Sequence, residues 1–118
     1  MKIKFNGNNP IYLQIVLYFK IQIINGTLLP GQILPSRREI ATLLGVNINT
    51  VQRAFTELER ESIIVNHPNR NSTIQDDLLV IKKIRIDLIR KYLDVFLEDV
   101  KDINVSFSEI VTILKGKY

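Results

Sequence analysis

One 22-residue stretch, "LPSRREIATLLGVNINTVQRAF" from Leu34 to Phe55, constrains the fold of this 118-residue chain more than any other segment. Ser36 and Glu39 have the S-x-x-E spacing of a capping box, in which two side chains satisfy free N–H groups at a helix start. Gly45 supplies the left-handed residue that often follows a helix. The segment therefore predicts a short helix stopped by a tight turn. Its expected apolar stripe is Ile40, Leu43 and Leu44.

A second helix is predicted directly after this turn, capped by either Asn47 or Asn49. Its inward residues recur at i, i+3, i+4 and i+7: Val51, Ala54, Phe55 and Leu58. The residues left on its outward face are Asn49, Gln52, Arg53 and Thr56. These side chains match base edges, since Arg pairs with guanine, Asn or Gln with adenine, and Thr contacts a thymine methyl. An ordinary exposed polar face is the alternative for these residues alone.

Helix, tight turn and helix form the helix-turn-helix arrangement, in which the second helix presents its N-terminal residues to bases in the major groove. After Glu61 the pattern changes to "SIIVNHPNRNSTIQ", two β-rich runs around a turn cluster, which predicts a hairpin. A hairpin at this place is the wing of a winged helix. Arg70 at its tip, with His67 nearby, is expected to reach phosphate or the minor groove. His67 alone reads better as a plain turn residue.

The first 35 residues contain one further helix and a turn. Asn9 as N-cap, Pro10 as first helical residue and Asn25-Gly26 as stop predict a helix over residues 10–25. Pro30-Gly31 suits the middle of a type II turn, and Pro35 favours an extended Ile33-Leu34.

The tail, residues 76–118, predicts a long helix from about Asp77 to Lys101 and a short one capped by Ser106. Apolar side chains spread over roughly 220° of the long helix, more than one intramolecular contact covers. A homodimer is the economical explanation, with membrane-surface binding as a weaker alternative. The expected dimerisation residues are Ile81, Leu88, Tyr92, Phe96 and Val100.

Charge divides the chain in the same way. Residues 1–75 hold 8 Lys and Arg against 4 Asp and Glu, whereas residues 76–118 hold 8 against 8. A basic domain joined to a neutral one suggests a polyanion partner for the first, although a solvated surface explains charge alone equally well. We therefore expect a DNA-binding domain over 1–75 and a helical dimerisation region over 76–118.

Composition argues against other classes of protein. The chain has no Cys and a single His. It has no Gly-rich phosphate loop, so we expect no enzyme, metal or cofactor. The most apolar segment, "PIYLQIVLYFKIQII", is interrupted by Gln14, Lys20 and Gln22 and does not suit a membrane span or signal peptide. A soluble, cytoplasmic protein is expected.

The stretch "GTLLPGQILPSRREIATLLGVNINTVQRAFTELERESII" resembles the GntR transcription regulators, through the pattern LPS-x-R-x-(I/L)-A-x-x-L-G-V-x-x-x-T-V. The segments "PIYLQI" and "NTVQRA" and the short tail look most like its YtrA subfamily. The resemblance implies a mostly α fold with a small β-hairpin: a winged helix-turn-helix, a two-helix dimerisation region, and usually repression at a palindromic operator. Motif and resemblance together give these DNA-binding residues: Ser36, Arg37, Arg38, Asn47, Asn49, Thr50, Gln52, Arg53, His67 and Arg70.

Two positions depart from the family pattern. Ile48 stands where many GntR proteins have a basic residue, so base preference is expected to differ. Asn69-Arg70-Asn71 replaces the common Gly-x-Gly of the wing, which Asn can replace because it tolerates positive φ. An architectural or RNA-binding domain, and a truncated sensor whose tail binds a metabolite, are the alternative functions. The sequence names no operator, target operon or effector.

Overall fold

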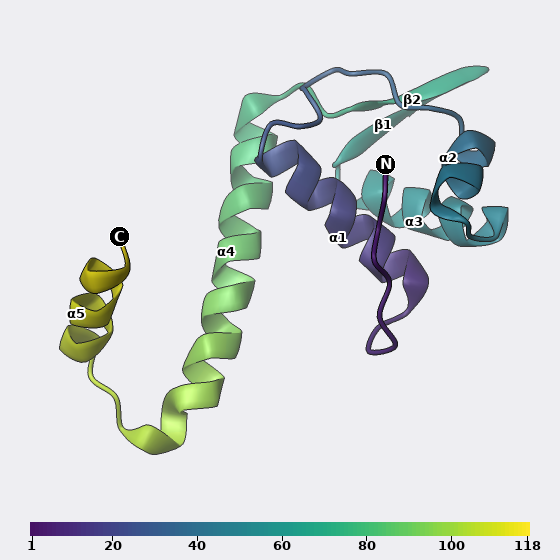
Figure 1. Cartoon of the computed structure of the whole chain (residues 1–118). Helices are drawn as coiled ribbons and strands as arrows, with labels where there is room; N and C mark the ends of the chain where they lie inside the picture. Colours follow the sequence, from purple (N-terminus) through teal and green to yellow (C-terminus); the bar gives the residue numbers. More distant parts are fainter. The chain divides into compact units, whose positions relative to one another are not determined.

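Five α-helices and one β-hairpin make up the chain in a computed structural model, which describes every residue from Met1 to Tyr118 (Figure 1). The elements are α1 (Ile11–Ile24), α2 (Arg37–Leu44), α3 (Ile48–Arg60), β1 (Ile64–His67), β2 (Arg70–Ile74), α4 (Leu78–Val100), a 3-10 turn η1 (Lys101–Ile103) and α5 (Phe107–Lys117). They form two compact units, Met1–Arg85 and Ile86–Tyr118. The mostly α fold with a small hairpin, predicted from the sequence, is confirmed.

The core of the N-terminal unit lies between α1, α3 and the hairpin. Phe19 of α1 and Phe55 of α3 meet edge to face with ring centroids 5.9 Å apart, a favourable aromatic geometry. All four residues predicted to face inward from α3 are buried: Val51, Ala54, Phe55 and Leu58. In α2 the prediction for Leu43 is wrong, because Leu43 is 54% exposed and Ala41 is buried beside Ile40 instead.

The start of α1 also differs from the prediction. Pro10 is the N-cap, no side chain caps the helix, and Asn9 lies outside it. Gln14 holds the preceding loop instead: its Nε2 donates to the carbonyl oxygens of Asn9 at 2.8 Å and Asn6 at 2.9 Å. The loop is thereby fixed to the first turn of α1.

Backbone hydrogen bonds join the α1–α2 connection to the hairpin. Gly31 has φ +75° in the predicted turn, where the Gln32 N–H donates to the Leu29 carbonyl at 3.0 Å. Leu34, which is buried, donates its N–H to the Ser72 carbonyl at 2.9 Å. The connection therefore runs beside β2, and it sets where α2 begins relative to the hairpin.

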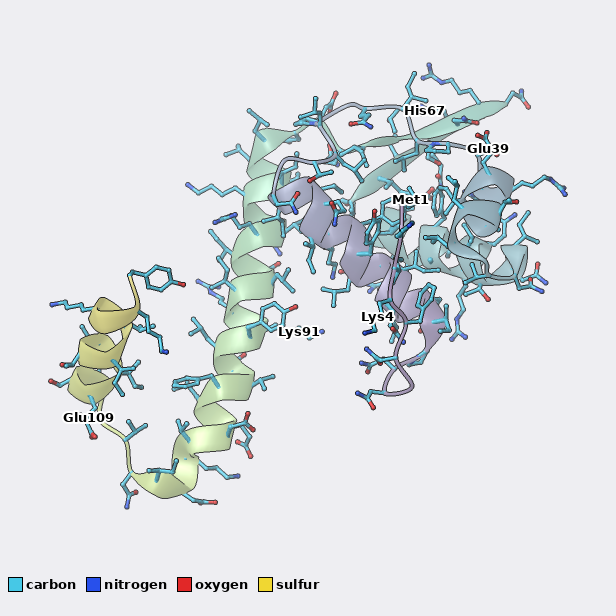
Figure 2. The ribbon with its side chains drawn as sticks, in the orientation of Figure 1. Met1, Lys4, Glu39, His67, Lys91 and Glu109 are labelled. Carbon is cyan, nitrogen blue, oxygen red and sulfur yellow. The ribbon has the colours of Figure 1, made fainter.

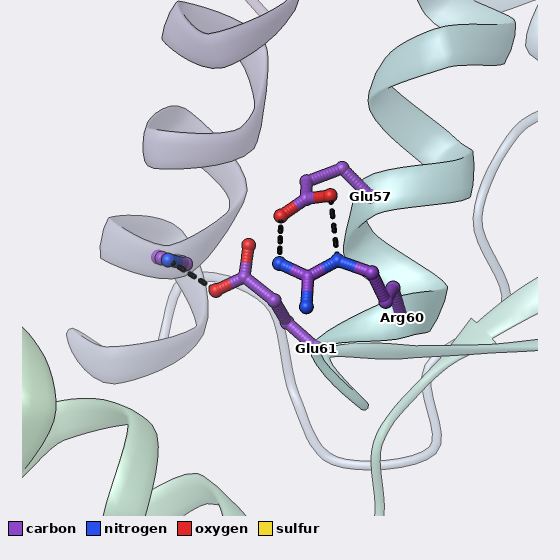
Figure 3. A network of polar contacts seen from close by, with 4 residues as sticks. Glu57, Arg60 and Glu61 are labelled. Atoms are coloured by element: carbon purple, nitrogen blue, oxygen red, sulfur yellow. Dashed lines mark hydrogen bonds and ion pairs between the residues drawn. The ribbon is translucent and has the colours of Figure 1, made fainter.

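An ion pair and a fork-like hydrogen-bonded pair lie at the end of α3 (Figure 3). Lys20 Nζ of α1 is 2.7 Å from Glu61 Oε1, which ties α1 to the C-terminal end of α3. Arg60 donates to both carboxylate oxygens of Glu57, with Nε to Oε2 at 2.9 Å. Hydrogen bonding from Arg60 lowers the pKa of Glu57 to about 2.

We predict a matching acid dependence of stability. The pKa of Glu57 is lowered by folding, so its contribution is present above about pH 4.5 and is lost as the pH falls towards 2. Glu57→Gln should therefore lower the melting temperature at pH 6 and have little effect near pH 2. Arg60 is mostly exposed, so solvent screening keeps the effect at pH 6 small. Asp99→Asn, at an exposed carboxylate, is the control in thermal melts, and an equal Glu57→Gln effect at both pH values contradicts the prediction.

The C-terminal unit contains no fully buried side chain. The long helix and its successor form as predicted, and Ser106 Oγ caps α5 by accepting the Glu109 N–H at 3.1 Å. The N-terminal unit extends past residue 75 to Arg85, because Ile84 is buried and Val80 and Ile81 pack against its core. None of the helices is both long and apolar enough to cross a membrane.

Candidate nucleic-acid interface

The start of α2 is built by its capping box. Ser36 Oγ accepts the Glu39 N–H at 3.1 Å, and the Ser36 N–H donates to Glu39 Oε1 at 3.4 Å. Glu39 lies at the start of α2 (Figure 2). The Ser36 hydroxyl is therefore occupied within the chain, whereas the Arg38 side chain that follows is exposed. Of these residues, Arg38 is the one free to meet a ligand.

The turn between α2 and α3 follows the predicted design. Gly45 has φ +67°, and the Val46 N–H donates to the Ala41 carbonyl at 3.0 Å. Asn47 is the cap of α3, since its Oδ1 accepts the Asn49 N–H at 2.7 Å. This places Asn49 as the second residue of α3 and decides between the two candidate caps. The exposed residues in the first two and a half turns of α3 are Asn49, Gln52, Arg53 and Thr56, and Glu59 and Arg60 follow at its end.

Two arginines at this surface lie over aromatic rings, a feature that the sequence did not indicate. The Cζ of Arg37 is 5.2 Å from the centroid of Phe55, and its Nη1 donates to Gln52 Oε1. The Cζ of Arg53 is 3.9 Å from the centroid of Tyr12, near the start of α1. Both contacts fall in the range of cation–π interactions. They hold the long cationic side chains close to α3.

The hairpin carries the other two basic candidates. His67 is the last residue of β1 (Figure 2) and not a turn residue as predicted. Its Nδ1 is 3.0 Å from Arg70 Nη2, and its Nε2 is 2.9 Å from Thr73 Oγ1. Because arginine only donates, Nδ1 must accept, so Nε2 carries the proton. Asn69 takes φ +57° in the turn, as expected for an Asn that replaces glycine.

A hollow of about 310 Å³ opens between the start of α2, α3 and the hairpin. Three of its lining residues, Arg37, His67 and Arg70, are basic, and none is acidic. A second hollow, of about 340 Å³, lies between the starts of α1 and α3. It is lined by Pro10, Ile11, Tyr12, Asn49, Thr50 and Arg53. Both are open surfaces rich in hydrogen-bond donors, which suits the phosphates and base edges of a nucleic acid.

The predicted site residues thus form two groups on the N-terminal unit. Ser36, Arg37, His67 and Arg70 surround the first hollow, and Asn49, Thr50 and Arg53 border the second. Gln52 is bonded to Arg37 at the edge of the first group. Arg38 is exposed on α2, and Asn47 lies in the turn. Three helices followed by a hairpin, with this donor-rich surface, define a winged helix-turn-helix DNA-binding protein.

Comparison with known proteins identifies the family. Residues 11–74 match the model of the bacterial regulatory proteins of the gntR family. The chain belongs to this family, whose members are transcription regulators and not enzymes.

The relatives match the sequence of this chain over different shares of its length. The uncharacterized HTH-type transcriptional regulator YhcF of Bacillus subtilis is 31% identical over 95% of this chain and 93% of its own. The HTH-type transcriptional repressor YtrA of Bacillus subtilis is 42% identical over 60% of this chain, but over only 55% of its own length. A GntR family transcriptional regulator from Listeria monocytogenes has a similar structure, with a TM-score of 0.88 and 32% identity. That likeness covers 95% of this chain and 98% of the other.

Proposed function

We propose that this DNA-binding transcription regulator acts as a cytoplasmic homodimer that represses transcription at a palindromic operator. The observation that carries the proposal is a polar face of α3. Asn49, Gln52, Arg53 and Thr56 are exposed there, just after the turn between α2 and α3. Helix-turn-helix proteins read bases from this place, and dimers read two related half-sites. Repression is supported by YtrA of Bacillus subtilis, which is described as a repressor.

Roles for the basic residues follow from their surroundings. Arg53 is placed on base edges, because it projects from the first two turns of α3. Arg38 is placed on a phosphate, because it lies in the first turn of α2, where the positive end of the helix also favours anions. Arg37, His67 and Arg70 are placed around a second phosphate at the hollow beside the hairpin.

The proposed dimer rests on apolar side chains that the C-terminal unit leaves uncovered. Tyr92 is 52% exposed and Phe96 is 41% exposed, and Leu88 of the same helix is half-buried. These side chains recur every four residues along α4, so a second copy of the chain could cover them together. Ile81 packs against the N-terminal core, so its contribution to an interface is smaller than the sequence suggested.

We predict that Arg70→Ala weakens DNA binding without changing base preference. Arg70 lies at the hairpin and lines the basic hollow, so its loss removes a backbone or minor-groove contact. Affinity at moderate salt should fall, while guanine protection in the major groove stays as in the parent chain. Asn69→Gly, which keeps the positive φ of the turn, is the control. Unchanged affinity of Arg70→Ala would show that the wing does not contact DNA.

The test of the proposed function is selection from a library of random DNA duplexes with the full chain. A sequence-specific dimer should enrich a two-fold symmetric site and bind it about 10³-fold or more tighter than scrambled duplex. An architectural or RNA-binding protein would enrich no site and would show only salt-dependent, sequence-tolerant binding. That outcome would overturn the proposal and favour the alternative.

A further inference from the structure

The side chain of Arg53 contacts a ring of α1, and its N–H donors have no partner within the chain. Its Cζ lies 3.9 Å from the Tyr12 ring centroid, which is van der Waals contact. The central carbon therefore lies over the face of the ring, close enough for the guanidinium to stack on it. Its only interaction within the chain is this stacking, so no carboxylate or carbonyl occupies its N–H donors.

Stacking matters because of the geometry of arginine. The five N–H donors of a guanidinium lie in its plane, so contact through the face leaves all of them available at the edge. Guanine offers O6 and N7 side by side, and bidentate pairing places the guanidinium in the plane of the base. A long side chain ordered before binding loses less conformational entropy when the complex forms.

The neighbouring residues indicate which ligand this ordered arginine meets. Tyr12 and Arg53 line the hollow at the start of α3 together with Asn49 and Thr50, and no acidic residue lines it. Arg37, by comparison, lies 5.2 Å from its ring and already donates to Gln52. Of the two arginines over aromatic rings, only Arg53 has N–H donors with no hydrogen-bond partner in the chain.

We propose that Tyr12 is a specificity-determining positioning residue, whose ring fixes the plane of Arg53 for pairing with a base. The inference rests on the proposed function, since it requires that Arg53 read a base. It adds a residue of α1 to the determinants of base preference, outside the helix-turn-helix itself. Tyr12 acts through Arg53 and makes no base contact of its own.

The experiment compares variants of the full chain on two probes, the duplex enriched from the random library and a scrambled duplex of the same composition. Tyr12→Leu removes the aromatic face and should lower the ratio of the two affinities about tenfold. Tyr12→Phe keeps the face and should stay within about twofold of the parent chain. In an Arg53→Ala background, Tyr12→Leu should cause no further loss, because the ring then has no arginine to position.

Tyr18→Leu is the matched control. Tyr18 lies on the same helix and packs edge-on against Phe19 at 5.7 Å, with no arginine over its ring. It should leave the affinity ratio unchanged. If Tyr12→Leu lowered the affinity for both duplexes equally, the role of Tyr12 would be merely structural, and the proposal would be overturned. Loss of specificity in Tyr12→Phe would overturn it as well, since the hydroxyl would then be the contact.

A measurement without DNA separates this inference from the proposed function. In the free chain, ring current should shift the Arg53 side-chain proton resonances, and the shift should persist in Tyr12→Phe and vanish in Tyr12→Leu. Absence of the shift in the parent chain would overturn the positioning role directly. If the shift is present but no duplex is enriched by selection, the proposed function fails, and the assignment of Tyr12 to specificity fails with it.

Discussion

Replacing Leu88, Tyr92 and Phe96 with glutamine should make the chain monomeric and lower its affinity for a full palindrome by roughly 10² to 10⁴. These side chains follow one another along α4, and Tyr92 and Phe96 are about half exposed. Glutamine keeps the helix, because its helix propensity is high, but removes the apolar anchors of the proposed interface. The loss arises because a dimer binds its second half-site intramolecularly, whereas a monomer does not.

The measurement combines light scattering with binding to a palindrome and to a single half-site. The triple variant should scatter as a monomer at tens of micromolar and bind the half-site like the parent chain, because no DNA-facing residue has changed. Leu78→Gln with Leu79→Gln is the matched control, since both residues are apolar, highly exposed and on the same helix. A parent chain that is monomeric, or a variant that binds the palindrome equally well, rules out this interface.

The second large effect is a difference between two arginines. Arg53→Ala should cost about 1 to 3 kcal/mol on the selected duplex and relax base preference at one position of each half-site. Arg38→Ala should weaken binding to every duplex alike and reduce the slope of log affinity against log salt by about one. The reason is that a base contact is lost only where that base is present, whereas a phosphate contact is made on any sequence.

Titrations at several salt concentrations on selected and scrambled duplexes separate the two roles. Arg60→Ala is the control, because Arg60 is the last residue of α3, the helix of Arg53, and is hydrogen-bonded to Glu57. It should leave both affinity and salt slope unchanged. Identical behaviour of Arg53→Ala and Arg38→Ala would show that the assignment of a base to one and a phosphate to the other is wrong.

Local signals in the sequence predicted the helix-turn-helix well. The capping box of Ser36 and Glu39 forms between residues three apart, and the positive φ of Gly45 ends the same helix. Such local geometry does not depend on the rest of the fold. The buried set of α3 was equally clear, because four apolar residues at helical spacing leave only one face to bury. The hairpin followed from its β-rich runs and the Asn-rich turn.

Errors arose where tertiary packing decides between neighbouring residues. In α2, Leu44 lies about 40° from Ile40 on the side of Ala41, whereas Leu43 lies about 60° to the other side. The buried face is centred on the Ala41 side, so Leu43 remains exposed. A helix of only eight residues has too few apolar positions for its sequence to show where the buried face is centred. His67 was misread for a similar reason, since its bonds to Arg70 and Thr73 depend on strand register.

Two further features were not predicted: the extended segment at the N-terminus, for which the sequence contains a pattern, and the contact of Arg53 with Tyr12, for which it contains none. The first residues, "MKIKF", alternate apolar and basic, and Met1, Ile3 and Phe5 are indeed partly buried against the core while Lys2 and Lys4 are exposed. That period of two indicates an extended segment with one buried side. The stacking of Arg53 on Tyr12 joins residues 41 positions apart, and it follows only from how α1 packs on α3. No local pattern predicts such a pair.

Guanine N7 methylation protection, with the full chain on its selected duplex, tests the central claim most directly. If α3 lies in the major groove and the chain binds as a dimer, two groups of protected guanines should appear about 10 base pairs apart and related by two-fold symmetry. Arg53→Ala should abolish protection at one guanine of each group. Binding without any guanine protection, or protection that lacks the two-fold symmetry, would contradict the account.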